Sequence, residues 1–372
     1  MHLPVIIAGA LAATVVMAHP GHDIRAEAAE LRETLGMMAR ADLSHCAEKI
    51  KARGLEVRAI ARRTELASRL AKKSGIIAGR DFGTVLKTSH HSNESYTLKT
   101  PASELFGSNN SCILSPEVTE GPYYVSGEYV RKNVIEDQPG VPLTLDLQVL
   151  DMETCDPVPN VYLEIWHCNS TGVYSGVAAN GNGNGDGSNI DATFLRGVQK
   201  TDQDGVSLFE TLFPGHYQGR APHIHVMVHH NASARANGTL EDTTASHVGQ
   251  VYFDQALINA VESTSVYKAN TQALLLNEND FLFAEGARTS DPVVNYVTLG
   301  KNIEDGLLGW IAFGINSTMV REVHAATTLY KEGGKANEGG IGGPGGPGGP
   351  PPPGFSGFPT GFPPVPTAVP QA

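Results

Sequence analysis

Between residues 112 and 320 the chain is divided into short apolar runs separated by turns that contain glycine or proline, and this pattern restricts the fold most. Residues 143–150 alternate apolar and polar side chains, which is typical of a strand with one buried face. Asp204 and Gly205 predict a tight turn between two strands. Further strand-like runs occur at 161–166, 248–253 and 293–298. Many short strands predict a mainly β protein whose main domain, residues 112–320, is a β-sandwich.

The regions on either side of this domain have different compositions. Apolar residues recur every three to five positions in residues 24–73, which predicts a helical hairpin or one bent helix that breaks at Gly54, within a helical segment covering 19–80. Residues 81–111 are rich in polar residues and predict a linker. Residues 335–372 contain Gly-Gly-Pro repeats and a proline run, so we expect a disordered tail.

Several features predict a secreted, extracellular protein. Residues 1–18 are apolar and end in small residues, which is typical of a signal peptide. No later apolar run is long enough to span a bilayer, so no membrane association is expected. Glycosylation sequons occur at Asn93, Asn109, Asn169, Asn231, Asn237 and Asn316.

The cysteine count and the net charge restrict the class of protein further. Four cysteines are an even number, as expected for two disulfides formed in an oxidising compartment, and three pairings are open. These cysteines are Cys46, Cys112, Cys155 and Cys168. The net charge of −12 argues against nucleic acid as a partner.

The stretch from Pro214 to His225 carries the residues best suited to chemistry. His223 and His225 begin a strand-like run, so both imidazoles should lie on one face and could form half of a metal site. Alternatively, they are hydrogen-bonded strand histidines without a metal. Tyr217 in the same stretch and Tyr174 upstream are possible phenolate ligands. Phenolate oxygen suits Fe(III), whereas imidazole alone would leave copper and zinc open.

Four separated segments resemble the intradiol ring-cleavage dioxygenases, most of all their secreted fungal branch. They are Thr-Glu-Gly-Pro-Tyr-Tyr-Val at 119–125, Glu-Ile-Trp-His-Cys-Asn-Ser-Thr-Gly-Val-Tyr at 164–174, Arg196-Gly197 with Thr201-Asp202, and the stretch 214–225. The resemblance covers about residues 110–317 and implies a non-haem Fe(III) held by Tyr174, Tyr217, His223 and His225. It also places the arginine of the family's Arg-x-x-His-x-His motif at Arg220 and its pocket glutamine at Gln250.

The resemblance implies an extracellular enzyme of aromatic catabolism that takes a catechol and O2, inserts both oxygen atoms and opens the ring between the hydroxylated carbons to a muconate-type diacid. Tyr217 would be a labile iron ligand and the base, Arg220 would stabilise negative charge on the ring, and Gln250 would orient the substrate or Arg220. Only five residues separate Tyr217 from His223, fewer than in intracellular members, so the substrate identity is not implied. Tyr123 and Tyr124 either lie near the pocket mouth or only pack.

Two other functions and one partner are also possible from the sequence. The protein could be a secreted, catalytically silent β-sandwich that binds aromatics or metal, or could bind copper at an amino-terminal His19. By analogy with catechol-cleaving members, the helical segment could form a homodimer. Retention of both tyrosines, both histidines and Arg220 favours the enzyme.

Overall fold

The computed structural model describes residues 28–29, 32, 43–73, 111–113, 121–230, 232–241, 244–245, 247–287 and 291–338. The predicted signal peptide lies outside these residues, as do the predicted linker apart from Ser111 and the predicted tail beyond Glu338. Among the described residues, no helix has both the length and the hydropathy that crossing a bilayer requires.

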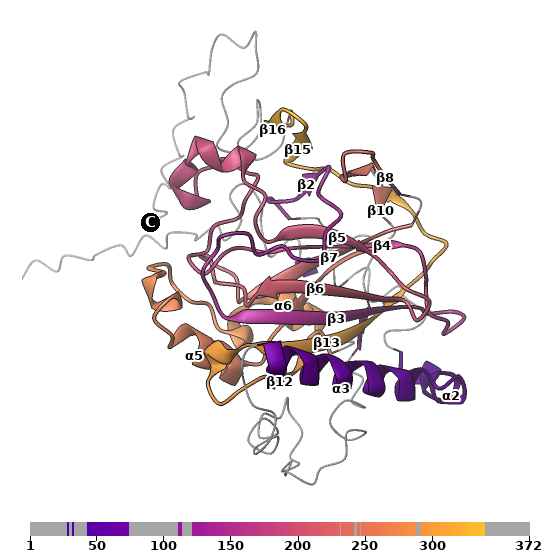
Figure 1. The fold of residues 1–372 in the computed structure, drawn as a ribbon. Helices are drawn as coiled ribbons and strands as arrows, with labels where there is room; N and C mark the ends of the chain where they lie inside the picture. The colour runs from indigo at the N-terminus through magenta and orange to yellow at the C-terminus, as the bar shows by residue number, and fades with distance from the viewer. Residues whose placement is uncertain are drawn as a thin grey trace, which may run out of the picture.

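Two main sheets form a sandwich, which confirms the mainly β prediction (Figure 1). In the first sheet, here sheet A, β13 and β3 run parallel, whereas β3–β6 and β12–β13 are antiparallel. Its order is β1 (Ser111–Ile113), β13 (Leu307–Ile315), β3 (Pro142–Asp151) and β6 (Val206–Leu212), with β12 (Asn295–Thr298) also paired to β13.

Sheet B is antiparallel throughout and carries the paired histidines. Its order is β11 (His247–Tyr252), β7 (His223–His229), β4 (Tyr162–Trp166) and β5 (Arg196–Lys200). Gly205 adopts φ +73° in the turn between β5 and β6, which confirms the predicted turn. The predicted strands match β3, β4, β11, β12 and β7 to within a few residues.

The main core lies between the two sheets. Leu145 and Leu147 of sheet A and Ile165 and Val226 of sheet B are fully buried in it. Because strand side chains alternate, the residues between them face outward, and on sheet B that outer face is covered by a second buried cluster containing Trp166 and several tyrosines. This second cluster contains the predicted site.

The described part of the N-terminal helical segment consists of η1 (Ser44–Cys46), α2 (Ala47–Ala52) and α3 (Leu55–Lys73). Gly54 separates α2 from α3 with φ +64°, a left-handed conformation that glycine adopts without steric cost, so the predicted break is confirmed. The buried residues of α3 include Leu55, Ala59, Leu66, Ala67 and Ala71, which gives the helix one apolar face.

Helix α3 lies along the outer face of sheet A, as Figure 1 shows. Leu66 packs in a cluster with Trp310, and burying a leucine contributes about 2 kcal/mol. Asp146 lies between two core-facing leucines of β3, so its carboxylate faces α3, where it accepts from Arg62 Nε at 2.6 Å and lies 3.4 Å from Arg63 Nε. Burial lowers the pKa of Arg63 to about 10, although the Asp146 charge opposes that shift.

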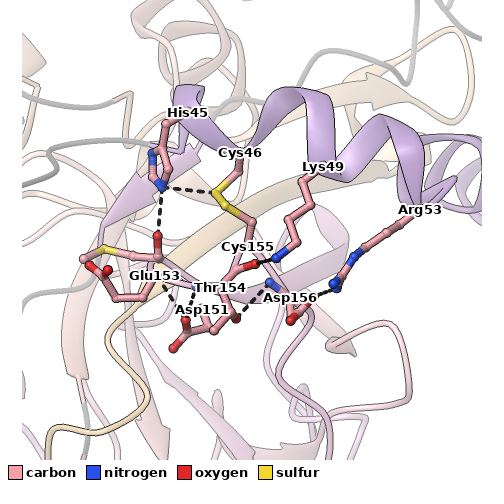
Figure 2. The surroundings of a disulfide bond; sticks show 10 residues. His45, Cys46, Lys49, Arg53, Asp151, Glu153, Thr154, Cys155 and Asp156 are labelled. Carbon is pink, nitrogen blue, oxygen red and sulfur yellow. Dashed lines mark hydrogen bonds and ion pairs between the residues drawn. A yellow bond between two sulfur atoms is a disulfide. The ribbon is translucent and has the colours of Figure 1, made fainter.

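A disulfide joins Cys46 to Cys155, in the turn after β3, across 109 residues of sequence. Figure 2 shows two further contacts beside it, Lys49 to the Thr154 carbonyl oxygen and Arg53 to Asp156. The helical segment is therefore covalently and electrostatically attached to sheet A.

The prediction of two disulfides is wrong, because Cys168 carries a free thiol. Its sulfur is buried and donates to the Gly215 carbonyl oxygen at 3.4 Å. The side chain of Cys112 lies outside the described residues.

The remaining elements surround the two sheets. Strand β16 includes Lys335 and Ala336, so regular structure continues past the predicted start of the tail. The small strands are β2 (Val125–Ser126), β8 (Ser233–Ala234), β9 (Leu240–Glu241), β10 (Thr244–Ala245), β14 (Arg321–Glu322), β15 (Thr327–Tyr330) and β16 (Gly333–Ala336). The helices are α5 (Gln255–Glu262), α6 (Phe281–Gly286), η3 (Gly183–Gly185), η4 (Gly187–Asp191), η5 (Tyr267–Ala269), η6 (Asn277–Asn279) and η7 (Ile303–Asp305).

Candidate functional site

The paired histidines lie on the outer face of sheet B. Ile224, between them, is in the sandwich core, so His223 and His225 both face the second cluster. Their Nε2 atoms lie 3.2 Å apart. His223 Nδ1 lies 2.7 Å from the Ala221 carbonyl oxygen, which can only accept, so Nδ1 carries the hydrogen and Nε2 presents its lone pair. Trp166 stacks on His225 with ring centroids 4.7 Å apart.

Tyr174 enters the cluster from the loop after β4. Asn182 holds the backbone of Tyr174 on both sides, because its Oδ1 accepts from Tyr174 N at 2.7 Å and its Nδ2 donates to Tyr174 O at 2.8 Å. Asn189 Nδ2 donates to the same carbonyl oxygen at 2.5 Å. The sequence predicts a mobile loop at residues 180–187. Instead this loop forms η3 and the start of η4, and Asn182 is buried.

Tyr217 enters from the loop before β7, and hydrogen bonds on both sides hold that loop. His216 Nδ1 lies 2.8 Å from Glu262 Oε1, and His216 Nε2 lies 3.0 Å from the Gln272 carbonyl oxygen. On the other side, Gln218 N donates to Gln272 Oε1 at 3.0 Å. The backbone around Tyr217 is therefore fixed by α5 and the segment that follows it.

The four predicted metal ligands form a closed ring of contacts. Ring centroids lie 5.5 Å apart for Tyr174 and Tyr217, 5.7 Å for Tyr217 and His223, 4.8 Å for His223 and His225, and 6.1 Å for His225 and Tyr174. All four side chains are buried. Residues from two loops and one strand are thus brought together as the sequence predicts.

Burial dominates the electrostatics of the two phenols. It raises the pKa of Tyr174 and of Tyr217 well above the usual value for tyrosine. The Arg220 charge opposes that rise in the pKa of both groups without overcoming it. A buried phenolate here would therefore require a strong positive charge beside it.

The donor set fits a trivalent hard cation such as Fe(III). Tyr174 Oη is buried and has no hydrogen-bond partner within the part of the chain that the structure describes, which is costly for a polar atom unless a ligand satisfies it. The Nε2 atoms of both histidines approach each other on the same side. Two phenol oxygens and two imidazole nitrogens supply anionic and neutral donors of the kinds that bind oxidised iron.

Another group of possible metal ligands within the described residues is His45, Cys46 and Cys155. Both sulfurs belong to the disulfide, and His45 Nε2 lies 2.8 Å from the Met152 carbonyl oxygen, to which it can donate a hydrogen bond. This group is therefore a structural feature of the helix attachment.

Arg220 is buried beside the ring of ligands and is held from two directions. Its Nε donates to Asp280 Oδ2 at 2.8 Å, and its Nη2 donates to Gln250 Oε1 at 2.5 Å and to Tyr252 Oη at 2.8 Å. Tyr252 Oη in turn donates to Gln250 Oε1 at 2.7 Å. Burial is the largest single effect and would lower the pKa of Arg220, but the Asp280 charge and hydrogen bond, together with Tyr252 and Tyr217, outweigh it and raise the pKa, so the guanidinium stays charged.

Arg196 supports the other side of the cluster. Its Nη2 donates to the carbonyl oxygens of Tyr123 and Ser175 at 2.7 Å each, which ties the segment before β2 to the loop that carries Tyr174. Its guanidinium carbon lies 5.9 Å from the centroid of the Tyr174 ring. The cation therefore both fixes the backbone and faces the aromatic ring.

Tyr123 and Tyr124 are both buried and pack in the cluster. The Tyr123 ring stacks on Tyr174 at 4.6 Å, and Tyr124 lies 5.2 Å from Trp166. Gly121 lies just before them with φ +75°, and a Cβ there would approach His225 Cε1 to 3.1 Å. The glycine allows this segment to cover His225 closely.

Sequence reasoning missed several residues that support the site. Tyr252 could have been found, because it lies two positions after Gln250 on one strand and so shares its face. Asp280, Asn182 and Glu262 had no such signal, because each reaches the site only through the folding of a separate loop or helix.

Comparisons with known proteins find similarity to dioxygenases. A family model described as Dioxygenase matches residues 117–280. Catechol 1,2-dioxygenase of Acinetobacter baylyi is 26% identical over 198 residues, covering 46% of this chain and 60% of that protein. Catechol 1,2-dioxygenase 1 of Acinetobacter lwoffii is 34% identical over 109 residues, covering 28% and 32%. This chain thus spans less than two thirds of the length of either protein.

A solved structure matches along nearly all of its own length. The intradiol ring-cleavage dioxygenase from Tetranychus urticae is 33% identical, and the match covers 55% of this chain and 96% of that chain with a TM-score of 0.45.

Proposed function

This chain belongs to the intradiol ring-cleavage dioxygenase family, and we propose that it is a non-haem Fe(III) enzyme that cleaves catechol-type aromatics. It would insert both atoms of O2 and open the ring between the two hydroxylated carbons, giving a muconate-type diacid. The observation that carries this proposal is the closed ring of contacts among Tyr174, Tyr217, His223 and His225 beside the buried Arg220.

Tyr174, Tyr217, His223 and His225 would hold the iron, which when bound would supply a Lewis acid that makes an attached catechol reactive toward O2. Tyr174 is held in place because Asn182 and Asn189 bind its backbone and Tyr123 stacks on its ring. His223 is oriented by its Nδ1–H bond to the Ala221 carbonyl oxygen.

Tyr217 is the proposed proton acceptor. Its phenol oxygen would take the proton of a catechol hydroxyl, so one residue would serve as ligand and base. Glu262 binds the side chain of His216 and Gln272 binds the backbone of Gln218, so the loop on both sides of Tyr217 is held in place. Only the side chain of Tyr217 would therefore move. A change confined to side-chain rotation requires no rearrangement of the loop.

Arg220 and Gln250 are the proposed substrate-binding pair. Arg220 is fully buried and permanently charged, so it can stabilise negative charge on the substrate ring in a site that excludes water. Gln250 Oε1 accepts from Arg220 and from Tyr252, which leaves the Gln250 side chain fixed beside the guanidinium.

The test of this function combines iron analysis with turnover. We expect the purified protein to contain iron, to be coloured by tyrosinate-to-iron charge transfer, and to consume O2 with a panel of substituted catechols while giving ring-opened diacids by mass spectrometry. The Tyr174→Phe variant should lose colour and iron. A folded, iron-free and colourless wild type would contradict the proposal and favour a silent binding protein.

We also propose that the protein is secreted, as expected for the secreted fungal branch of the family. The Cys46–Cys155 disulfide supports an oxidising compartment. Of the sequons, Asn237 is exposed, whereas the Asn169 amide donates to Gln138 Oε1 at 3.0 Å inside a folded loop. Peptide mapping after glycosidase treatment should therefore find a glycan at Asn237 and none at Asn169, and an unmodified Asn237 in protein exported by a glycosylating host would argue against this assignment.

The proposed small-molecule partners are an aromatic diol and O2. A homodimer through the N-terminal helical segment remains a prediction by analogy. The oligomeric state of the protein can be measured by analytical ultracentrifugation.

A further inference from the structure

The two carboxylate oxygens of Asp280 have different partners, the N-terminus of a helix and the buried Arg220. Oδ1 accepts from the backbone amides of Leu282 at 2.9 Å and Phe283 at 3.0 Å, so it caps the N-terminus of α6. Oδ2 accepts from Arg220 Nε at 2.8 Å and from Ala221 N at 2.9 Å. With 1% of its surface exposed, Asp280 makes these bonds without competition from bulk water.

The two bonds of Oδ2 hold both the side chain and the backbone of one short segment. The Ala221 peptide nitrogen donates to Asp280, while the Ala221 carbonyl oxygen accepts from His223 Nδ1 at 2.7 Å. Arg220 is therefore connected through a single residue to a proposed iron ligand. A displacement of Asp280 would move the arginine relative to that ligand.

A second nitrogen of the guanidinium, Nη2, is held by sheet B. Nη2 contacts Gln250 and Tyr252 of β11, and the guanidinium is planar, so contacts at Nε and Nη2 fix the plane of the whole group. The ring of Phe283 in α6 lies 5.0 Å from the Tyr252 ring, edge to face. The helix that Asp280 caps thus also packs against the second support of Arg220.

A counter-ion that only neutralised buried charge would not need this arrangement, because any carboxylate nearby would suffice. Here the same oxygen binds Nε and the next peptide nitrogen, which selects one orientation of the arginine side chain. We propose that Asp280 is the positioning residue that aims Arg220 at the substrate ring during the cleavage reaction. This proposal rests on the proposed function of the site.

Two variants separate the charge of Asp280 from its capping role. Asp280→Asn keeps the size of the side chain but places an amide or a neutral oxygen opposite Arg220, and Asp280→Ser keeps a capping oxygen without the charge. Both should retain iron and colour, because no iron ligand is changed. With a catechol that the wild type cleaves, both should lose roughly 10- to 100-fold in kcat, on the scale of one misplaced charge-stabilising donor.

Asp254 provides a matched control. It caps α5 in the same way, because its Oδ1 accepts from Leu257 N at 2.8 Å, but it makes no described contact with Arg220. Asp254→Asn removes a charge and keeps a capping oxygen, as Asp280→Asn does, so it should change the unfolding temperature little and leave kcat unchanged. An equal loss of kcat in Asp254→Asn would mean that the effect is general loosening, and it would overturn the positioning role.

A double-mutant cycle tests whether Asp280 acts through Arg220. If it does, Asp280→Asn should cost little further rate once Arg220→Lys is present, so the two losses should not multiply. Fully multiplied losses, or wild-type kcat in both Asp280 variants, would overturn the proposal. A wild type without O2 uptake on any catechol would instead overturn the proposed function itself, and the positioning role with it.

Discussion

Removal of the Cys46–Cys155 disulfide should substantially destabilise the protein. The bond closes a loop of 109 residues, and a cross-link of that span lowers the entropy of the unfolded chain by about 16 cal/mol/K, or ~4.8 kcal/mol at 25 °C. Native distortion and residual unfolded structure usually reduce this value, so we expect the Cys46→Ala, Cys155→Ala double variant to lose about 2–5 kcal/mol in its free energy of unfolding.

Urea unfolding followed by tryptophan fluorescence measures this loss, because Trp310 lies under α3 and Trp166 lies in the site cluster. Wild type treated with dithiothreitol should shift as the double variant does, whereas the double variant should not respond to dithiothreitol. Cys168→Ala is the matched control, since it removes a buried sulfur that is not in a disulfide. A loss below about 0.5 kcal/mol for both the double variant and reduced wild type would refute this account of the attachment.

Three further predictions concern single residues. Asp146→Ala should destabilise the protein by about 3–5 kcal/mol in urea unfolding, because it removes the carboxylate beside the buried Arg63. Asp204→Ala, which removes the half-buried partner of the exposed Arg58 on α3, should cost far less. Tyr217→Phe should lose O2 uptake while calorimetry still detects catechol binding, and unchanged turnover would mean that the base is misassigned. Hydrogen bonds, led by that from the Ser317 hydroxyl, outweigh burial and lower the pKa of Asp151 to about 2, so its contribution to stability should be present above about pH 4 and lost as the pH falls towards 2. Asp151→Asn should flatten that part of the stability profile, and an unchanged acid limb would contradict the assignment.

The parts of the fold that sequence predicts well are those set by neighbouring residues. Alternation alone places His223 and His225 on one face and Ile224 on the other, and the structure has the same arrangement. The break at Gly54 follows in the same way, because only the local backbone decides whether a left-handed residue fits. The meeting of Tyr174 and Tyr217 was predicted by the resemblance to a family, since no local pattern joins two loops.

The parts that sequence could not predict depend on contacts between distant segments. An even cysteine count suggested two disulfides, but Cys168 is buried against a backbone carbonyl and remains a thiol. The glycine- and asparagine-rich loop lacks apolar residues and so looked mobile, yet Asn182 folds it by bonding the backbone of Tyr174. Polar side chains that bind buried backbone leave no periodic signal in the sequence.

The position of α3 limits how the helical segment could serve as an interface. Its apolar stripe, with Leu66 and Ala67, is already used against sheet A of the same chain. Of its exposed face, Val57 is the large hydrophobic residue, and the other exposed side chains are mostly charged, including Arg58, Glu65, Arg69, Lys72 and Lys73. A second copy that docked on α3 would therefore have to bring charged surfaces together, which favours weak and salt-dependent contact.

The candidate site lies on the outer face of the opposite sheet, with the sandwich core between it and α3. Attachment of the helices and chemistry at the site are thus physically separate, so changes that loosen α3 should lower stability before they alter the geometry around His223.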